Sequence, residues 1–330
     1  MKTPCLKILL LCIISFLALP ARAADKPPAD DPTADILNDI VTAKPTTQKS
    51  APPSVTVPET FWQHWRDLTT FFAPGLALAA AIGIAGAVCG VLVLLRREAL
   101  LALALPQVVA AGAAVGLRLN WPTLPPALVA AGAALLYLVI TRRRRRHGNA
   151  DAALPALYIS GLCLSFLVIA GASAHVEELQ NLFTGIDVAV TPARAFAAVP
   201  ILLAVAAAVA ISWRRWLIVA QAPAAAELAG VNPAHWDAIF LLLLTVVLLL
   251  GTDSQGVVMV LAMLFLPAAT VLPWAKRIPT ALITAAAVSL IMVVAAFILS
   301  NALAWPFSQS AGGAGFVLLI VSHLLAMLTA

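Results

Sequence analysis

The chain has 330 residues, of which 62% are hydrophobic and only 11% are charged. A soluble domain of this length would carry about 25% charged residues. The composition therefore excludes an ordinary soluble enzyme and predicts that hydrocarbon surrounds most of the chain. The net charge of +5 does not indicate nucleic-acid binding, because the basic residues flank apolar segments that are long enough for bilayer spans.

The first 23 residues have the order of a secretory signal peptide. Lys2 and Lys7 precede an apolar run, and Ala21 and Ala23 form an A-x-A cleavage site. An uncleaved anchor is the alternative, and both readings place the next segment outside the membrane. Residues 24–60 are polar and rich in proline, so we expect a disordered extracytoplasmic linker.

The region 61–330 is expected to form an all-α, polytopic transmembrane bundle with about nine spans. The backbone of a span in lipid must satisfy its own hydrogen bonds, which favours helices. The apolar runs cover 71–95, 99–117, 122–140, 154–174, 195–212, 236–251, 256–275, 280–304 and 314–329.

Basic residues are distributed unevenly over the loops between these spans. If the first span starts outside, the inner loops hold four basic groups: Arg96–Arg97, Arg142–Arg146, Arg214–Arg215 and Lys276–Arg277. The outer flanks hold only Arg66, Arg118 and Arg194. This excess of cations on the inner side follows the positive-inside rule and predicts the orientation of every crossing.

Four stretches, in order, resemble one family of transporters. They are Gly75 to Gly116 with its Arg96–Arg97 pair, Leu182-Phe-Thr-Gly-Ile-Asp187-Val-Ala-Val-Thr-Pro192, Ala224-Ala-Ala-Glu227-Leu-Ala-Gly230-Val231, and Gly256 to Thr270 with its Leu-Pro-Ala-Ala-Thr ending. Their order and spacing are similar to the permease subunits of the ABC importers for zinc, manganese and iron.

The resemblance implies a permease in the bacterial inner membrane that moves divalent metal ions. It also implies a homodimer of permeases, a cytoplasmic ABC ATPase and an extracytoplasmic metal-binding protein. The chain has no G-x-x-x-x-G-K-[ST] phosphate loop. We therefore expect a transport subunit that is not an enzyme and binds no covalent cofactor, with ATP used by the partner.

The short segment between Pro223 and Pro233 lies inside by this topology. In the family this region contacts the ATPase, and Glu227, Ala229 and Gly230 match the family pattern. The resemblance thus assigns ATPase coupling to these residues, with a solvated connector as the alternative.

The family carries an Asp and, four residues later, a His on its second helix, but Leu103 and Gln107 stand there in this chain. Leucine cannot bind a metal, and an amide oxygen is a weaker ligand than imidazole. A polar group at this depth still favours a place on the transport pathway, so Gln107 remains a candidate beside a purely structural role.

Four other polar residues are candidates for the pathway. His175, Glu177 and Asp187 fall in one outer loop that could receive a cation, and His323 lies in the last span. Which of them binds a metal is left open by the sequence. Asp253 is expected in a tight turn from Gly251 to Gly256.

Two other functions stay open at this point. Because Leu103 and Gln107 replace the family's ligand pair, the cargo could be another small solute or a metal chelate. A secondary carrier is a different class, but the expected internal repeat with broken helices is not evident in the sequence.

Overall fold

The computed structural model divides the chain into two units, Met1–Glu59 and Thr60–Ala330. It describes residues 61–144, 153–170, 183, 192–303 and 306–329. The expected signal peptide and the expected linker therefore lie outside the described residues.

The described residues form helices and no strand. The helices are α3 (Phe61–Leu95), α4 (Ala99–Arg118), α5 (Leu124–Arg144), α6 (Ala153–Ala170), α8 (Pro192–Gln221), α9 (Pro223–Leu228), α10 (Pro233–Val271), α11 (Ile278–Leu303) and α12 (Phe307–Thr329). Within the described part, six of them (α3, α4, α8, α10, α11 and α12) are long and apolar enough to cross a membrane. α5 and α6 contain shorter apolar stretches. The expectation of a polytopic helical bundle is confirmed.

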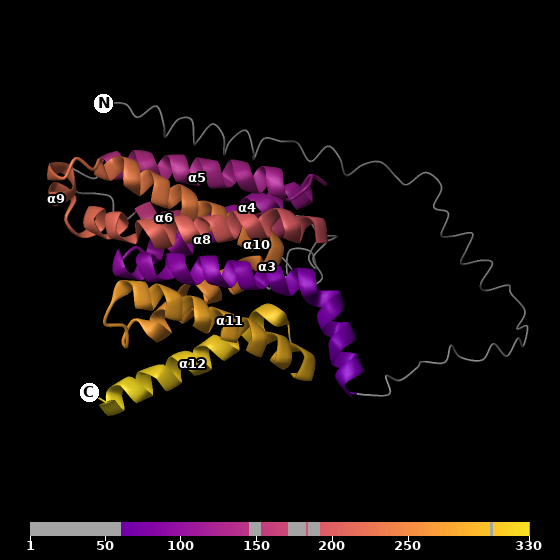
Figure 1. The fold of residues 1–330 in the computed structure, drawn as a ribbon. Coiled ribbons are helices and arrows are strands. Elements are labelled where there is room, and N and C mark those ends of the chain that lie inside the picture. The colour runs from indigo at the N-terminus through magenta and orange to yellow at the C-terminus, as the bar shows by residue number, and fades with distance from the viewer. Residues whose placement is uncertain (1–60, 145–152, 171–182, 184–191, 304–305, 330) are drawn as a thin grey trace, which may run out of the picture. The chain divides into compact units, whose positions relative to one another are not determined.

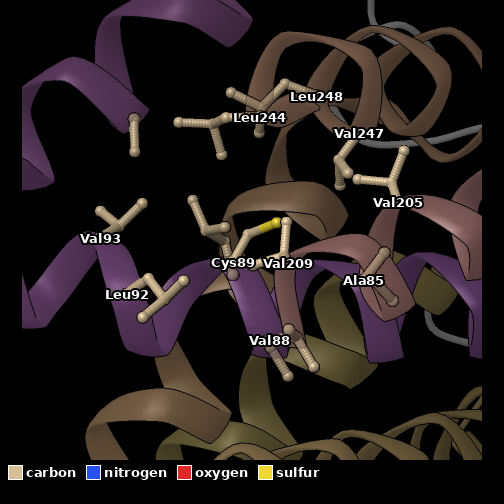
Figure 2. Close-up of a cluster of buried hydrophobic side chains, with 14 of the residues drawn as sticks. Ala85, Val88, Cys89, Leu92, Val93, Val205, Val209, Leu244, Val247 and Leu248 are labelled. Atoms are coloured by element: carbon tan, nitrogen blue, oxygen red, sulfur yellow. The ribbon is translucent and has the colours of Figure 1, made fainter. Parts of the chain in front are cut away.

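The core of the bundle is built around α3. This helix packs against α8, α10 and α11, and Figure 1 shows α8 on one side of it and α11 on the other. In Figure 2, Cys89 of α3 meets Val209 of α8, while Leu244 and Leu248 come from α10. Cys89 is fully buried among these aliphatic side chains, as expected for an apolar packing residue.

The backbones of α3 and α10 come unusually close at Gly90. A β-carbon on Gly90 would lie only 1.8 Å from the carbonyl oxygen of Leu264. Such proximity is typical of helix pairs in membranes, where association depends on close packing of small residues rather than on burial from water. Met259 and Met263, on the same arm of α10, are fully buried in an apolar cluster and serve as packing residues.

The helix α10 is bent back on itself at Gly256. That residue has φ 79° and ψ 163°, which interrupts the helix. A β-carbon on Gly251 would lie 2.5 Å from Cγ2 of Val260, although nine residues of straight helix span about 13.5 Å. The expected tight turn from Gly251 is thus wrong in its extent: the helix continues to Gln255, and the chain reverses at Gly256 alone.

Hydroxyl groups inside the apolar helices donate to their own backbone. Thr245 Oγ1 lies 2.6 Å from the carbonyl oxygen of Leu241, and Ser165 Oγ lies 2.9 Å from that of Gly161. These bonds follow the i to i−4 pattern and satisfy groups that lipid could not.

Polar contacts at the two ends of the bundle agree with the alternating topology. Thr123 Oγ1 donates to Asp253 Oδ1 at 2.7 Å, which joins two segments expected on the outer side. At the other end, Trp274 Nε1 donates to Ser322 Oγ, and that hydroxyl donates to the carbonyl oxygen of Thr270. Segments predicted to share a side of the membrane are therefore in contact.

Candidate functional site

The expected coupling segment forms the six-residue helix α9, which ends in a Schellman motif. The amide of Gly230 donates to the carbonyl of Glu227, and the amide of Val231 donates to that of Ala226. Gly230 has φ 73°, the left-handed conformation that this motif requires. Ala229 is the C-cap, and Glu227 is exposed.

The helix α3 also ends in a Schellman motif, which forms the turn to α4. The amide of Arg97 donates to the carbonyl of Leu94, and the amide of Glu98 donates to that of Val93. Arg97 occupies the left-handed position with φ 57°, where glycine is the usual residue. The two basic residues that the sequence groups together thus differ: the side chain of Arg97 is exposed, and that of Arg96 is buried.

Arg96 is the centre of a buried polar cluster. Its side chain is 1% exposed and forms ion pairs with Asp237, in the first turns of α10, and with Glu98 Oε1 at 3.3 Å. Its Nη1 donates to the carbonyl oxygen of Trp216 in α8, at 3.5 Å. The guanidinium carbon lies 4.4 Å from the centre of the Phe240 ring, a distance suited to a cation–π interaction.

Aromatic rings enclose this cluster. The ring of Trp216 meets that of Trp236 edge to face with centres 4.8 Å apart, and it also contacts Phe240. The guanidinium carbon of Arg215 lies 5.0 Å from the centre of the Trp236 ring. The rings cover the side chain of Arg96, which is 1% exposed, whereas its partners Glu98 and Asp237 are 19% and 31% exposed.

A cavity of about 670 Å³ opens beside the cluster. Its lining brings together the α3–α4 turn, the end of α8, the coupling segment and the start of α10. Charged residues in that lining are Arg96, Arg97, Glu98, Glu227 and Asp237. All of these segments belong to the side of the membrane that the sequence predicts to be inner.

Gln107 lies in the middle of α4 and is 6% exposed. Its Oε1 is buried and accepts no hydrogen bond from the residues that the structure describes. The helix α6 approaches it closely, since a β-carbon on Gly161 would lie 3.0 Å from the carbonyl carbon of Gln107. Leu103, one turn earlier, is partly buried.

His323, the other pathway candidate that the structure describes, is not brought together with Gln107. His323 is exposed on α12, and its Nδ1 lies 3.0 Å from the carbonyl oxygen of Leu319 on the same helix. His175, Glu177 and Asp187 fall outside the described residues. Among the residues that are described, no three His, Cys, Asp or Glu side chains gather into a metal site.

Sequence reasoning missed Asp237 and the aromatic residues around Arg96. Asp237 stands at the start of an apolar span, and an ionisable residue there is a signal in itself, because such residues usually have a partner. Trp213 and Trp216 flank Arg214 and Arg215, and Trp236 lies between His235 and Asp237. This pattern indicates a membrane interface but does not identify Arg96 as the residue that the rings enclose.

A bundle in which six of the described helices are long and apolar enough to cross a membrane defines a polytopic membrane protein. Residues 69–330 match the model of the ABC 3 transport family, and the chain belongs to that family. This confirms the resemblance to ABC importer permeases and a multi-pass location in the bacterial plasma membrane.

Individual proteins show the same relationship. The chain is 26% identical over 200 residues to the manganese transport system membrane protein MntC of Listeria innocua, covering 61% of this chain and 71% of that protein. It is 24% identical over 246 residues to the manganese import system permease protein ScaB of Streptococcus gordonii, covering 73% and 85%. The structure of PsaBC from Streptococcus pneumoniae in complex with Fab has the same fold, with a TM-score of 0.66, 21% identity and coverage of 79% and 95%.

Proposed function

We propose that this chain is the permease subunit of an importer for divalent metal ions and that manganese is its cargo. The match of residues 69–330 to the transport family carries the proposal, and relatives named as manganese permeases favour this ion over zinc or iron. The transport subunit itself performs no ATP hydrolysis. A cytoplasmic ATPase supplies the energy, and an extracytoplasmic metal-binding protein delivers the ion.

The cation asymmetry and the shape of α10 support nine crossings of the membrane. Each arm of α10, before and after Gly256, forms one crossing, because the reversal places Gly251 beside Val260. With this count the coupling segment and the Arg96 cluster face the cytoplasm. Two permeases form the working unit, and each presents its α9 to one ATPase.

The inner cavity supports a coupling role for α9. Glu227 reaches the lining of a space that Arg96 and Asp237 also line, so the coupling segment and the bundle meet there. Gly230 fixes the end of the segment through its left-handed conformation. A rigid, exposed helical turn of this kind can transmit a push from an ATPase better than a loose loop can.

The pathway of the ion passes Gln107 in this proposal. Its buried Oε1 accepts no hydrogen bond from the described residues, and its lone pairs could serve a cation or the hydration water of that cation. One amide cannot neutralise a dication, and a bare charge in a buried site is costly. The ion therefore keeps part of its water at this level, and Glu177, Asp187, His175 and His323 serve as additional donors along the route.

The leucine at position 103 favours a cargo other than a bare metal ion. Without a carboxylate at that position, a metal chelate or another neutral small solute would cross more easily than a bare dication.

A transport assay distinguishes free Mn²⁺ from a chelate as the cargo. Proteoliposomes that contain the permease, its ATPase and its binding protein should accumulate radioactive Mn²⁺ when ATP is inside. Uptake of a chelate with no uptake of free Mn²⁺ would overturn the choice of cargo and leave the permease assignment in place.

A further inference from the structure

Arg96 joins two parts of the permease that the proposed function keeps separate. One is the coupling segment, whose helix α9 is separated from α10 by four residues. The other is α4, which carries Gln107. Arg96 binds Asp237 near the start of α10 and Glu98 immediately before α4, so one guanidinium contacts both.

The connection from the coupling segment to Asp237 is short and capped at both ends. The Schellman motif at Gly230 closes α9, and the side chain of Asn232 accepts hydrogen bonds from the amides of Ala234 and His235, which start α10. Hydrogen bonds thus fix both ends of this link, and only the four residues Ala229–Asn232 separate the two helices. A displacement of α9 therefore moves the first turns of α10, and Asp237 with them.

The connection from Glu98 to Gln107 is equally direct. The carbonyl of Glu98 accepts from the amides of Leu101 and Ala102 and thereby starts α4. Gln107 follows nine residues later on the same helix, about 13.5 Å along its axis. A pull on the side chain of Glu98 acts on the first turn of the helix that carries Gln107.

We propose that Arg96 is a positioning residue for transport, which transmits the displacement of the coupling segment to α4. The proposal rests on the proposed function, because it needs an ATPase that moves α9. A planar guanidinium can contact Asp237, Glu98 and the carbonyl of Trp216 at once, whereas a lysine ammonium is a single point of charge. A buried ion pair of this kind adds little net stability compared with apolar packing, but its geometry is strongly directional.

The test compares four variants in proteoliposomes with the ATPase and the metal-loaded binding protein. Arg96→Gln and Asp237→Asn should lower the ratio of stimulated to basal ATP hydrolysis at least about five-fold, the lower end of typical coupling effects. Arg96→Lys should recover part of that ratio. Arg277→Gln removes the same charge from an exposed arginine in another loop of the same side, and it should match the wild type.

A second measurement follows α4 itself. Spin labels at Leu119 and Leu303, two exposed residues at the outer ends of α4 and α11, should change their separation when ATP binds. Arg96→Gln should abolish that change, and Arg96→Lys should retain part of it. If Arg96→Gln does not assemble with the ATPase, Asp237→Asn carries the same test, because its side chain is about one-third exposed in the wild type.

Three results would overturn the role of Arg96. The first is a ratio of stimulated to basal ATP hydrolysis in Arg96→Gln that stays within about two-fold of the ratio in the Arg277→Gln control. Such a difference is smaller than a typical coupling effect. The second is an equal loss of basal and stimulated hydrolysis, which would indicate a structural role alone. The third is no recovery in Arg96→Lys. A wild-type complex without stimulation would instead refute the proposed function, and the coupling role of Arg96 with it.

Discussion

Gly251 faces Val260 across the reversal of α10, so closely that a β-carbon on Gly251 would lie 2.5 Å from Cγ2 of Val260. This relationship turns one helical stretch of 39 residues into two arms that pack side by side. It also explains how an apolar segment far longer than a bilayer core is accommodated, since 39 residues of straight helix would span about 58 Å.

The reversal depends on Gly256, whose φ of 79° and ψ of 163° lie in a region that is essentially restricted to glycine. We expect Gly256→Ala to destabilise the purified permease by about 1–3 kcal/mol. Thermal unfolding in detergent measures this. Gly132→Ala is the matched control, because that glycine is helical and has open space around it, and it should be neutral or slightly stabilising. Equal melting temperatures for the two variants would contradict the assigned role of Gly256.

The close approach at Gly90 predicts a second stability effect. Gly90→Ala places a methyl group 1.8 Å from the carbonyl oxygen of Leu264, so α3 and α10 must separate. We expect a loss of about 1–3 kcal/mol, the usual cost of overpacking. Gly312→Ala, with nothing near its added methyl group, serves as the comparison. An unchanged midpoint in chemical unfolding of Gly90→Ala would show that this packing is looser than described.

The end of the coupling segment predicts an effect of residue type at Gly230. A β-branched residue in the left-handed conformation costs about 1–2 kcal/mol, whereas asparagine tolerates it. A β-carbon at this position would meet no other atom, so a substitution affects only the backbone conformation. We expect Gly230→Val to reduce ATP-driven uptake while the permease stays folded, and Gly230→Asn to retain most of it. Similar uptake by both variants would remove the conformation of this residue from the coupling mechanism.

The proposed ion pathway predicts that one variant of α4 loses Mn²⁺ uptake and that another gains a metal-binding site. Gln107→Ala should lower Mn²⁺ uptake several-fold, because it removes the buried oxygen on that helix. Leu103→Asp combined with Gln107→His puts a carboxylate and an imidazole on one face of the helix and should create tight binding of Mn²⁺ or Zn²⁺. Uptake and calorimetric titration measure the two effects. Normal uptake by the first variant and no metal binding by the second would exclude α4 from a metal pathway.

Sidedness is accessible to cysteine labelling in intact cells, in a background without native cysteines. An impermeant reagent should modify Asn120→Cys, in the exposed turn between α4 and α5, and should not modify Lys276→Cys, in the exposed loop between α10 and α11. The expectation follows from the excess of cations on one side. Labelling with the opposite pattern would show that the assigned orientation is reversed and that the coupling segment lies outside.

The sequence predicted most of the helices because hydrophobicity and the need for internal hydrogen bonding leave few alternatives in a membrane. It located α9 and its Gly230 through the resemblance. It could not separate Arg96 from Arg97, since both follow the same apolar run and only the turn determines which one is buried. Nor could it pair Arg96 with Asp237, because the two residues are 141 positions apart and no local pattern encodes that contact. The environment of Gln107 likewise depends on α6, a helix more than 40 residues away in sequence.

Arg97 adopts the left-handed backbone conformation at the end of α3. We expect this residue to lower the stability of the folded permease and to favour its correct orientation during membrane insertion. Arg97 holds a conformation that costs about 1–2 kcal/mol for a residue with a β-carbon, and glycine would relieve this cost. Glycine, however, would remove one of the positive charges that we expect to retain this loop in the cytoplasm during insertion. We therefore expect Arg97→Gly to yield permeases that are harder to unfold once assembled, while a larger fraction of newly made chains enters the membrane in the wrong orientation.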